Sequence, residues 1–176
     1  KHFKYTNRGD LQWFLGFQVT RDRKAGTLKI DQGSFVRNML AEYNMLDCVP
    51  VSTPGVPGTH PGEKFMPGTG AEYDSEKAAM KLYPYRRVVG SLLWLARCTR
   101  PDLAFTAGIL SRALHNPGYV HKHAAKHALR YCKLTADHGL TFRRSATSTL
   151  TGQVDSDWQP DYGTSESNRR SATGWV

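Results

Sequence analysis

The stretch from residue 54 to residue 70 places the strongest limit on how this chain can fold, because it contains four prolines and five glycines. Proline removes a backbone hydrogen-bond donor, and both residues are unfavourable inside a helix or a central strand. We therefore expect an exposed loop here and a boundary between subdomains. The loop divides the chain into a shorter part before it and a longer part after it.

The part before the loop has the pattern of a β-hairpin followed by a helix. Apolar residues alternate along residues 11–19, as in a strand with one buried face. We expect that face to consist of Leu11, Trp13, Leu15, Phe17 and Val19. A turn through residues 23–26 leads to a second strand at residues 27–30, and Gly16 is a candidate for a bulge or a close backbone approach. Apolar residues at helical spacing then predict a helix at residues 32–43.

The part after the loop is expected to be mainly helical. Three segments have one broad apolar face at helical spacing, and three shorter segments alternate as strands do. We expect the helices from Pro84 onward, at residues 101–114 and at residues 119–135, and the strands at residues 140–142, 149–155 and 171–176. A hairpin, a group of helices and late strands together predict an α+β fold.

Composition excludes several classes of protein. The content of 39% hydrophobic and 11% aromatic residues is enough to build a core in 176 residues, so extensive disorder is not expected. No apolar run approaches the ~18–20 residues of a membrane span, so no membrane partner is expected. Cys48, Cys98 and Cys132 are far apart, which excludes a disulfide scaffold and a four-thiolate zinc site. They are expected to be reduced and packed, in a cytosolic or nuclear protein.

The positive charge of the chain is concentrated in one region. The formal net charge is +9, and residues 83–144 hold 11 basic but only two acidic side chains, Asp102 and Asp137. Such an excess is typical of a protein that binds a polyanion. The alternative is a basic, solvated surface without a partner.

The helix expected at residues 119–135 carries the most informative basic pattern. Lys122, Lys126, Arg130 and Lys133 are spaced by four, four and three residues, so they share one helix face. A polyanion along this face would turn the repulsion between them into attraction. The opposite face is expected to pack on the core through Val120, Ala124, Ala128 and Tyr131. An ordinary amphipathic helix with a basic outer face is the alternative.

Two other patterns are weaker. His123 and His127 have the spacing of two zinc ligands on one helix, but no third ligand lies nearby in the sequence, so structural histidines are the simpler interpretation. Asp155 and Asp157 end an expected strand and are the best acidic candidates. Two-metal phosphoryl chemistry needs further convergent carboxylates, so a solvated strand end is the alternative. The chain has neither a Gly-x-Ser-x-Gly nucleophile motif nor a P-loop.

Four ordered blocks, spread over residues 9–176, give the chain a resemblance to a known family. They are Trp13-Phe14-Leu15-Gly16-Phe17 with Gly26-Thr27-Leu28-Lys29-Ile30-Asp31-Gln32; Met45-Leu46-Asp47-Cys48-Val49-Pro50-Val51-Ser52-Thr53-Pro54; Tyr85-Arg86-Arg87-Val88-Val89-Gly90-Ser91-Leu92 with Thr99-Arg100-Pro101-Asp102-Leu103-Ala104; and Val154-Asp155-Ser156-Asp157-Trp158 with Arg169-Arg170-Ser171-Ala172-Thr173-Gly174. In this order they resemble the Pol polyprotein of Ty1/copia-type long-terminal-repeat retrotransposons, from the end of the reverse transcriptase into the start of ribonuclease H.

The resemblance implies a division of the chain. Residues 1–53 would be the end of the reverse transcriptase palm with a first thumb-like helix, residues 54–82 a Pro/Gly-rich linker, residues 83–144 a basic thumb- or connection-like helical region, and residues 145–176 the first strands of a ribonuclease H-like sheet. The parent reaction would be RNA-directed DNA polymerisation followed by hydrolysis of the RNA in the hybrid.

The resemblance also implies site residues and partners. Phe14, Leu15 and Gly16 look like the primer grip, and the four basic residues at 122–133 would contact template–primer phosphates. Asp155 matches the first catalytic, metal-binding carboxylate of ribonuclease H, with Mg²⁺, or Mn²⁺ in its place, as the cofactor. The expected partners are an RNA/DNA template–primer duplex and the remainder of the Pol polyprotein, in cytoplasmic virus-like particles and in the nucleus.

The chain also departs from the family pattern. It contains no Tyr-x-Asp-Asp polymerase motif, and the family's Gly-Tyr-Ser-Asp-Ala-Asp-Trp-Ala stands here as Gly152-Gln153-Val154-Asp155-Ser156-Asp157-Trp158-Gln159. Because the sequence opens on Lys1 and ends within an expected strand, we interpret it as an excerpt of a longer chain. Because neither active site is complete in it, we expect no polymerase or nuclease activity from it alone. The alternatives are a non-catalytic nucleic-acid-binding relic or repurposed module, and an interaction protein with no nucleic-acid role.

Overall fold

A computed structural model describes residues 4, 6–7, 9–59, 61, 65–145, 152, 154–157 and 172–175. The chain forms two compact units, Lys1–Arg143 and Arg144–Val176. The segments expected as palm end, linker and helical region therefore lie in one unit. The second unit begins one residue before the expected start of the ribonuclease H-like part.

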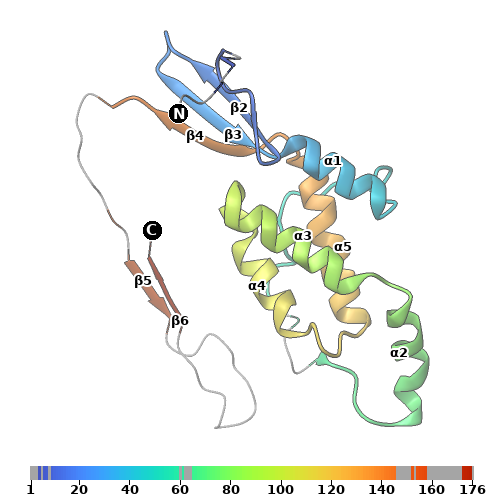
Figure 1. The fold of residues 1–176 in the computed structure, drawn as a ribbon. Helices are drawn as coiled ribbons and strands as arrows, with labels where there is room; N and C mark the ends of the chain where they lie inside the picture. Colours follow the sequence, from blue (N-terminus) through green and yellow to red (C-terminus); the bar gives the residue numbers. More distant parts are fainter. Residues whose placement is uncertain are drawn as a thin grey trace. The chain divides into compact units, whose positions relative to one another are not determined.

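A four-stranded antiparallel sheet lies at one end of the first unit (Figure 1). Its strands, in spatial order, are β1 (Trp13–Phe14), β2 (Phe17–Asp22), β3 (Thr27–Asp31) and β4 (Gly139–Arg143). The strand β4 joins from more than a hundred residues away and pairs Leu140 with Ile30. A Cβ atom on Gly139 would lie 2.3 Å from the Ile30 carbonyl oxygen, so this pairing requires glycine there. The β3–β4 pairing was not predicted.

The first strand of the hairpin is shorter than its alternation suggested, and the prediction of one apolar face over residues 11–19 was wrong. The chain reverses at Leu15 and Gly16, whose φ angles are 49° and 86°, and Phe14 then pairs with Phe17. Positive φ at both central residues is typical of a two-residue hairpin turn. No atom lies within 4 Å of a Cβ built on Gly16, so this glycine supplies a turn, not a bulge or a close backbone approach.

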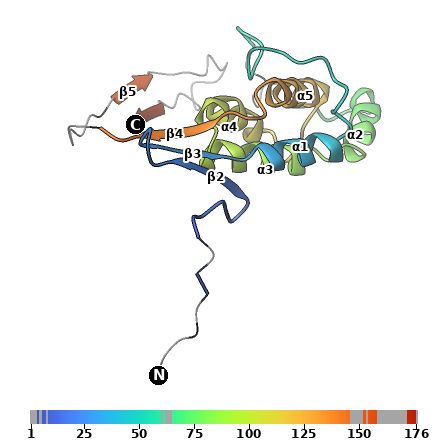
Figure 2. The same cartoon turned by 90° about the horizontal axis from the view of Figure 1, so that it is seen from above.

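The helices form at the expected places, with one addition. They are α1 (Gly33–Glu42), α3 (Tyr85–Cys98), the 3-10 helix η3 (Pro101–Leu103) with α4 (Ala104–Arg112), and α5 (Tyr119–Leu134). The unexpected elements are the 3-10 helix η2 (Ala71–Tyr73) and α2 (Asp74–Lys81), within the expected linker. Because α2 buries only Met80, it has no apolar stripe that sequence periodicity could reveal. Turned from the view of Figure 1, Figure 2 shows the sheet at one end of the helices and α2 at the other.

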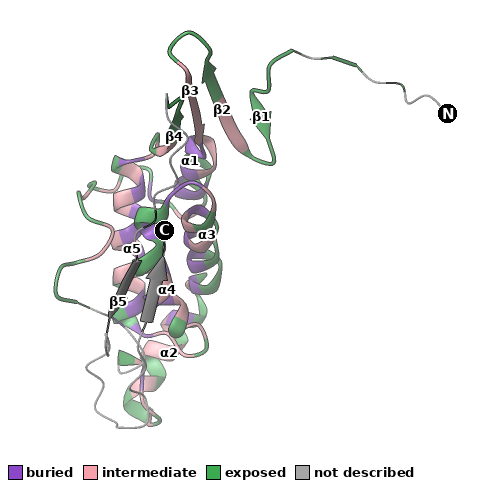
Figure 3. Ribbon diagram, turned by 90° about the vertical axis from the view of Figure 1, so that its left-hand side faces the viewer, coloured by how far each residue is buried: buried purple, intermediate pink, exposed green. Residues whose placement is uncertain are grey.

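The core of the first unit lies between α1, α3, α4 and α5 (Figure 3). Its fully buried apolar side chains include Val36, Val88, Val89, Leu92, Leu95, Leu103, Leu110 and Leu129. Cys132 is buried among them, while Cys48 and Cys98 are half-buried and free, as expected of packed cysteines.

The buried face of α5 differs from the predicted one. Ala125, Ala128, Leu129 and Cys132 are buried together with His121, whereas Val120 is 47% exposed. Of the predicted face, Ala128 is buried and Ala124 and Tyr131 are half-buried against the core, so the prediction was confirmed in part and was wrong for Val120. The helix packs on α1, α3 and α4 together, and contact with these three helices buries the stripe that includes Leu129. Sequence periodicity alone did not distinguish the two adjacent stripes.

The second unit contains a two-stranded antiparallel pair, β5 (Val154–Asp157) and β6 (Ala172–Trp175). Asp155 lies on β5 opposite Gly174. Together with the sheet and helices of the first unit, these strands agree with the predicted α+β class. None of the helices that the structure describes is long and apolar enough to span a membrane.

Candidate nucleic-acid interface

The basic face of α5 is divided by its contacts into two halves. Lys122, Lys126, Arg130 and Lys133 share this face, as predicted, and all four are half-buried. At its C-terminal end, Arg130 Nε donates to the Val49 carbonyl oxygen at 2.5 Å, and Lys133 Nζ donates to the Cys48 carbonyl oxygen at 2.7 Å. These two cations therefore fasten residues 48–53 onto the helix.

The N-terminal half of the face has different surroundings. Lys122 Nζ lies 5.2 Å from the centre of the Tyr83 ring, in a cation–π contact. Lys126 has no hydrogen bond or ion pair with any residue that the structure describes. Both ammonium groups are thus free of backbone acceptors and of carboxylates within the described part of the chain.

The histidines of α5 do not form a metal site with each other. His127 Nε2 donates to the Thr53 carbonyl oxygen at 3.0 Å, which adds a third contact to the segment at residues 48–53, and His123 is exposed. His121 is buried, and its Nδ1 accepts a hydrogen bond of 2.9 Å from the Gly118 amide at the start of the helix. No group of three or more His, Cys, Asp or Glu side chains suited to a metal ion occurs within the described ranges.

Both acidic side chains of the basic region are engaged by arginines. Asp102 Oδ2 lies 2.7 Å from Arg100 Nη2, and Asp137 Oδ1 lies 2.8 Å from Arg37 Nη1. The hydrogen bond and the charge of Arg37 lower the pKa of Asp137. The remaining cations of residues 83–144 therefore have no carboxylate of their own region to neutralise them.

Arg100 is a buried structural residue, a role that neither its charge nor its place in the third sequence block predicted. It is 1% exposed. Its guanidinium donates to Asp102 and to both the carbonyl and the hydroxyl oxygen of Thr135, at 2.9 and 2.6 Å. Tyr131 also donates its hydroxyl hydrogen to Asp102 Oδ2 at 2.8 Å. The cluster joins η3 to the C-terminal end of α5.

The pKa values of this cluster follow from two opposed effects. Burial raises the pKa of Asp102, but the hydrogen bonds from Arg100 and Tyr131 outweigh burial, so the net shift is downward. Burial lowers the pKa of Arg100, and the hydrogen bond and charge of Asp102 reverse this, so the net shift is upward. Both groups are therefore charged in the folded protein at neutral pH.

The same corner brings together two of the sequence blocks. Thr99, which precedes Arg100, donates its hydroxyl hydrogen to Gln32 Oε1 at 2.8 Å, and Gln32 is 2% exposed. The first block thus meets the third through buried polar side chains. The signal that could have identified the corner is an arginine two residues before an aspartate in an otherwise apolar region.

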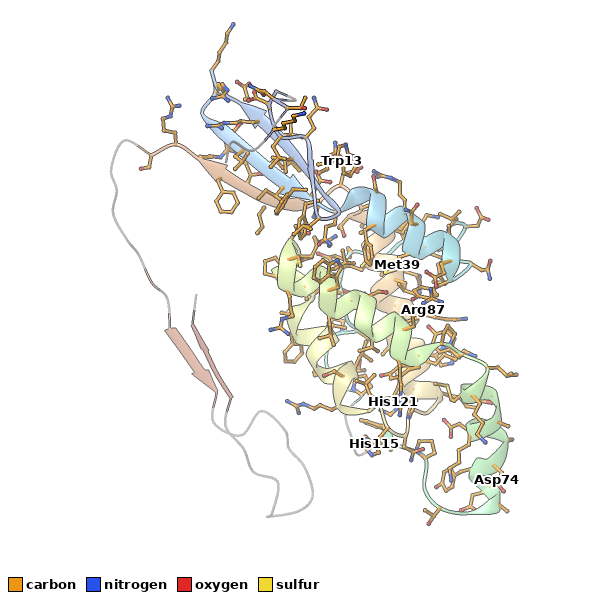
Figure 4. The ribbon with its side chains drawn as sticks, viewed as in Figure 1. Trp13, Met39, Asp74, Arg87, His115 and His121 are labelled. Atoms are coloured by element: carbon orange, nitrogen blue, oxygen red, sulfur yellow. The ribbon has the colours of Figure 1, made fainter. Side chains whose placement is uncertain are left out.

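The tip of the first hairpin presents apolar side chains to solvent. The Leu15–Gly16 turn leaves Phe14 55% and Leu15 74% exposed. Trp13, labelled in Figure 4, is 54% exposed. Phe17 lies behind the turn and stacks on Trp94 of α3, with 6.0 Å between ring centres. The structure therefore anchors the hairpin to α3 and leaves its tip uncovered by the described residues.

Asp155 lies outside the part of the chain whose side chains are described. Its backbone belongs to β5, where residues two apart, such as 155 and 157, share one side of the strand. Two carboxylates are the right ligand type for Mg²⁺ but are too few for a complete site.

Comparison with known proteins identifies the family. The chain is 36% identical over 176 residues to the retrovirus-related Pol polyprotein from transposon TNT 1-94 of Nicotiana tabacum, a match to all of this chain and 13% of the relative. It is 35% identical over 161 residues to the Pol polyprotein from transposon RE2 of Arabidopsis thaliana, 92% of this chain and 10% of the relative. The chain belongs to the Ty1/copia-type retrotransposon Pol family.

This Pol chain spans about a tenth of the length of the polyproteins that it matches. A third relative, an uncharacterized mitochondrial protein of Arabidopsis thaliana, is 30% identical over 177 residues, 98% of the Pol chain and 65% of the relative. No family model and no solved structure matches the Pol chain.

Proposed function

We propose that this Pol chain is the segment that runs from the end of the reverse transcriptase into the start of ribonuclease H, and that it binds the RNA–DNA template–primer duplex. One observation carries the proposal. Residues 83–144 hold 11 basic and two acidic side chains, and both acids are already paired with arginines. The unneutralised positive charge favours a polyanion over a neutral or basic partner.

Two surfaces would contact the duplex. Lys122 and Lys126 would contact backbone phosphates, because they are the cations of the α5 face that are not bound to carbonyl oxygens among the described residues. The exposed apolar tip at Phe14 and Leu15 would contact the primer end through its side chains and the backbone of the turn. The remaining polyprotein would supply the polymerase motif that the Pol chain lacks.

Asp155 is proposed to be one ligand of Mg²⁺ in the ribonuclease H part, with Mn²⁺ as a substitute. Such a cation would stabilise the charge that develops on the transferred phosphoryl group. The Pol chain contributes at most two neighbouring carboxylates to that site, so we expect no nuclease or polymerase activity from it alone.

The test is a binding measurement in which salt is the variable. We would follow the fluorescence anisotropy of a labelled 20-base-pair RNA–DNA duplex with the wild-type Pol chain and with the K122A/K126A variant. Each lost phosphate contact should reduce the slope of log K against log salt by about 1, so the double variant should lose about 2. The matched control is R21A/K24A, which removes the same charge next to the turn between β2 and β3.

The two results are easily told apart. A steep salt dependence in the wild type that becomes shallower only in K122A/K126A supports the proposal. Affinity that is absent at about 50 mM salt, or that falls equally in the control variant, contradicts it, because general charge would then explain any binding.

A further inference from the structure

A second basic site lies away from the hairpin and adjoins the proposed duplex contact at Tyr83, whose ring Lys122 contacts. It is a pocket of about 520 Å³ between the C-terminal half of α2, the start of α3 and the segment that follows α4. Its lining includes five basic side chains and no acidic one: Lys77, Lys81, Arg86, Arg87 and His115. Two of these, Arg87 on α3 and His115 beyond α4, are labelled in Figure 4.

Most of this charge is not neutralised by the residues that the structure describes. Lys77, Lys81 and His115 have no hydrogen bond or ion pair with any described residue. Arg86 uses its Nε to donate to the Leu114 carbonyl oxygen at 3.0 Å, and Arg87 pairs with Glu42 at 2.8 Å. Five basic groups thus share one carboxylate, and that carboxylate comes from α1, outside the pocket lining.

The start of α3 adds to the positive potential of the pocket. This 14-residue helix has no side-chain cap at Pro84 and no acidic residue in its first turn. The positive end of its dipole favours an anion, yet Arg86 and Arg87 stand there instead. Cations at this end of a helix are unfavourable by themselves, and a bound phosphate would convert the repulsion into attraction.

The pocket is also lined by apolar and aromatic side chains. Met80, Tyr83, Leu114 and Pro117 line it. Tyr83 is half-buried, burial raises its pKa to about 12, and its hydroxyl group has no hydrogen-bond partner among the described residues. A ligand that fills this pocket therefore needs both a negative group and a flat, weakly polar body. A nucleotide has both, because its phosphate is anionic and its base stacks on aromatic and apolar side chains.

We propose that this pocket binds a nucleotide, with the phosphate held by Lys77 and Lys81 of α2 and Arg86 at the start of α3, and with the base against Tyr83. The nucleotide is either free or a unit of a single strand, and the shared chemistry is a phosphate next to a base. The proposal does not depend on duplex binding by α5, since a mononucleotide can be titrated without any duplex.

The experiment is isothermal titration calorimetry of the whole Pol chain with four probes: dTMP, deoxythymidine, inorganic phosphate and a 12-nucleotide oligo-dT strand. We expect dTMP to bind at least tenfold more tightly than either deoxythymidine or inorganic phosphate, because only dTMP carries both the phosphate and the base. An oligo-dT affinity at least tenfold above that of dTMP would assign the site to a strand, and equal affinities would assign it to free nucleotide.

The key variant is K77Q/K81Q, since neither lysine has a partner among the described residues and the fold should tolerate both changes. It should weaken dTMP binding at least tenfold, while R21Q/K24Q, with the same loss of charge next to the β2–β3 turn, should leave it unchanged. No dTMP binding, phosphate binding as tight as dTMP binding, or equal weakening in both variants would each overturn the proposal. Duplex binding by α5 could persist in any of those cases.

Discussion

The two halves of the basic face of α5 have the same pattern in the sequence and different surroundings in the structure. Arg130 and Lys133 each donate to a carbonyl oxygen of residues 48–53, while Lys122 contacts only an aromatic ring and Lys126 has no partner among the described residues. The difference arises because a distant segment of chain crosses only the C-terminal half of the helix. A charged stripe thus contains structural cations and cations available to a ligand.

The largest effect on stability should come from a substitution of Arg100, because its guanidinium is buried and hydrogen-bonded to Asp102 and Thr135. In R100A, Asp102 and the Thr135 carbonyl lose their buried partner, so the free energy of unfolding should fall by about 3 kcal/mol. Urea denaturation monitored by circular dichroism measures this loss. R100K keeps the charge but not the forked geometry, and we expect it to recover less than half of the loss. A loss below about 1 kcal/mol in R100A would show that the corner does not stabilise the fold.

Removal of the two structural cations of α5 should have the next largest effect. R130A/K133A should lower the free energy of unfolding by about 2 kcal/mol, because two charge-assisted hydrogen bonds to backbone carbonyls are lost in a partly exposed setting. Hydrogen exchange should also become faster at residues 48–53. If neither the hydrogen exchange at residues 48–53 nor the free energy of unfolding changed, the two halves of the α5 face would not differ in structural role.

The complementary variant should change binding and leave stability unchanged. K122A/K126A should raise the dissociation constant for an RNA–DNA duplex about tenfold near 100 mM salt, with the free energy of unfolding unchanged within about 0.5 kcal/mol. Anisotropy and urea titrations on the same preparation measure the two quantities. If K122A/K126A lowers the free energy of unfolding as much as R130A/K133A does, the N-terminal cations of α5 are structural as well.

The smallest effect should be a decrease in the free energy of unfolding at acidic pH. The pKa of Asp102 is lowered in the folded protein from a usual value of 3.8, so its contribution is present above about pH 4 and is lost as the pH falls through the folded-state pKa. The free energy of unfolding should therefore decrease below pH 4. In D102N this decrease should be shallower, since the titrating group is absent. Equal slopes in the two proteins would assign the acid sensitivity to other carboxylates.

The positions of the helices and of the candidate binding face could be predicted from the sequence, because both are local patterns. Helical spacing located α1, α3, α4 and α5, and it placed Lys122 and Lys133 on one face. The same reasoning could not identify α2, which buries only Met80, or select the buried stripe of α5. The short turn at Leu15 and Gly16 was also missed, since alternation continues through it although the backbone reverses there.

The sequence by itself determined the α+β class, the order of the main helices and, through four ordered blocks, membership of the copia-type Pol family. The tertiary structure decided which charges are available. It placed β4 beside β3, buried Arg100 between η3 and the end of α5, and laid residues 48–53 over half of the α5 face. Sequence periodicity indicates which residues share one face of a helix or strand. Whether a cation meets a carbonyl oxygen or solvent depends on segments that are dozens of residues away, and only folding brings them together.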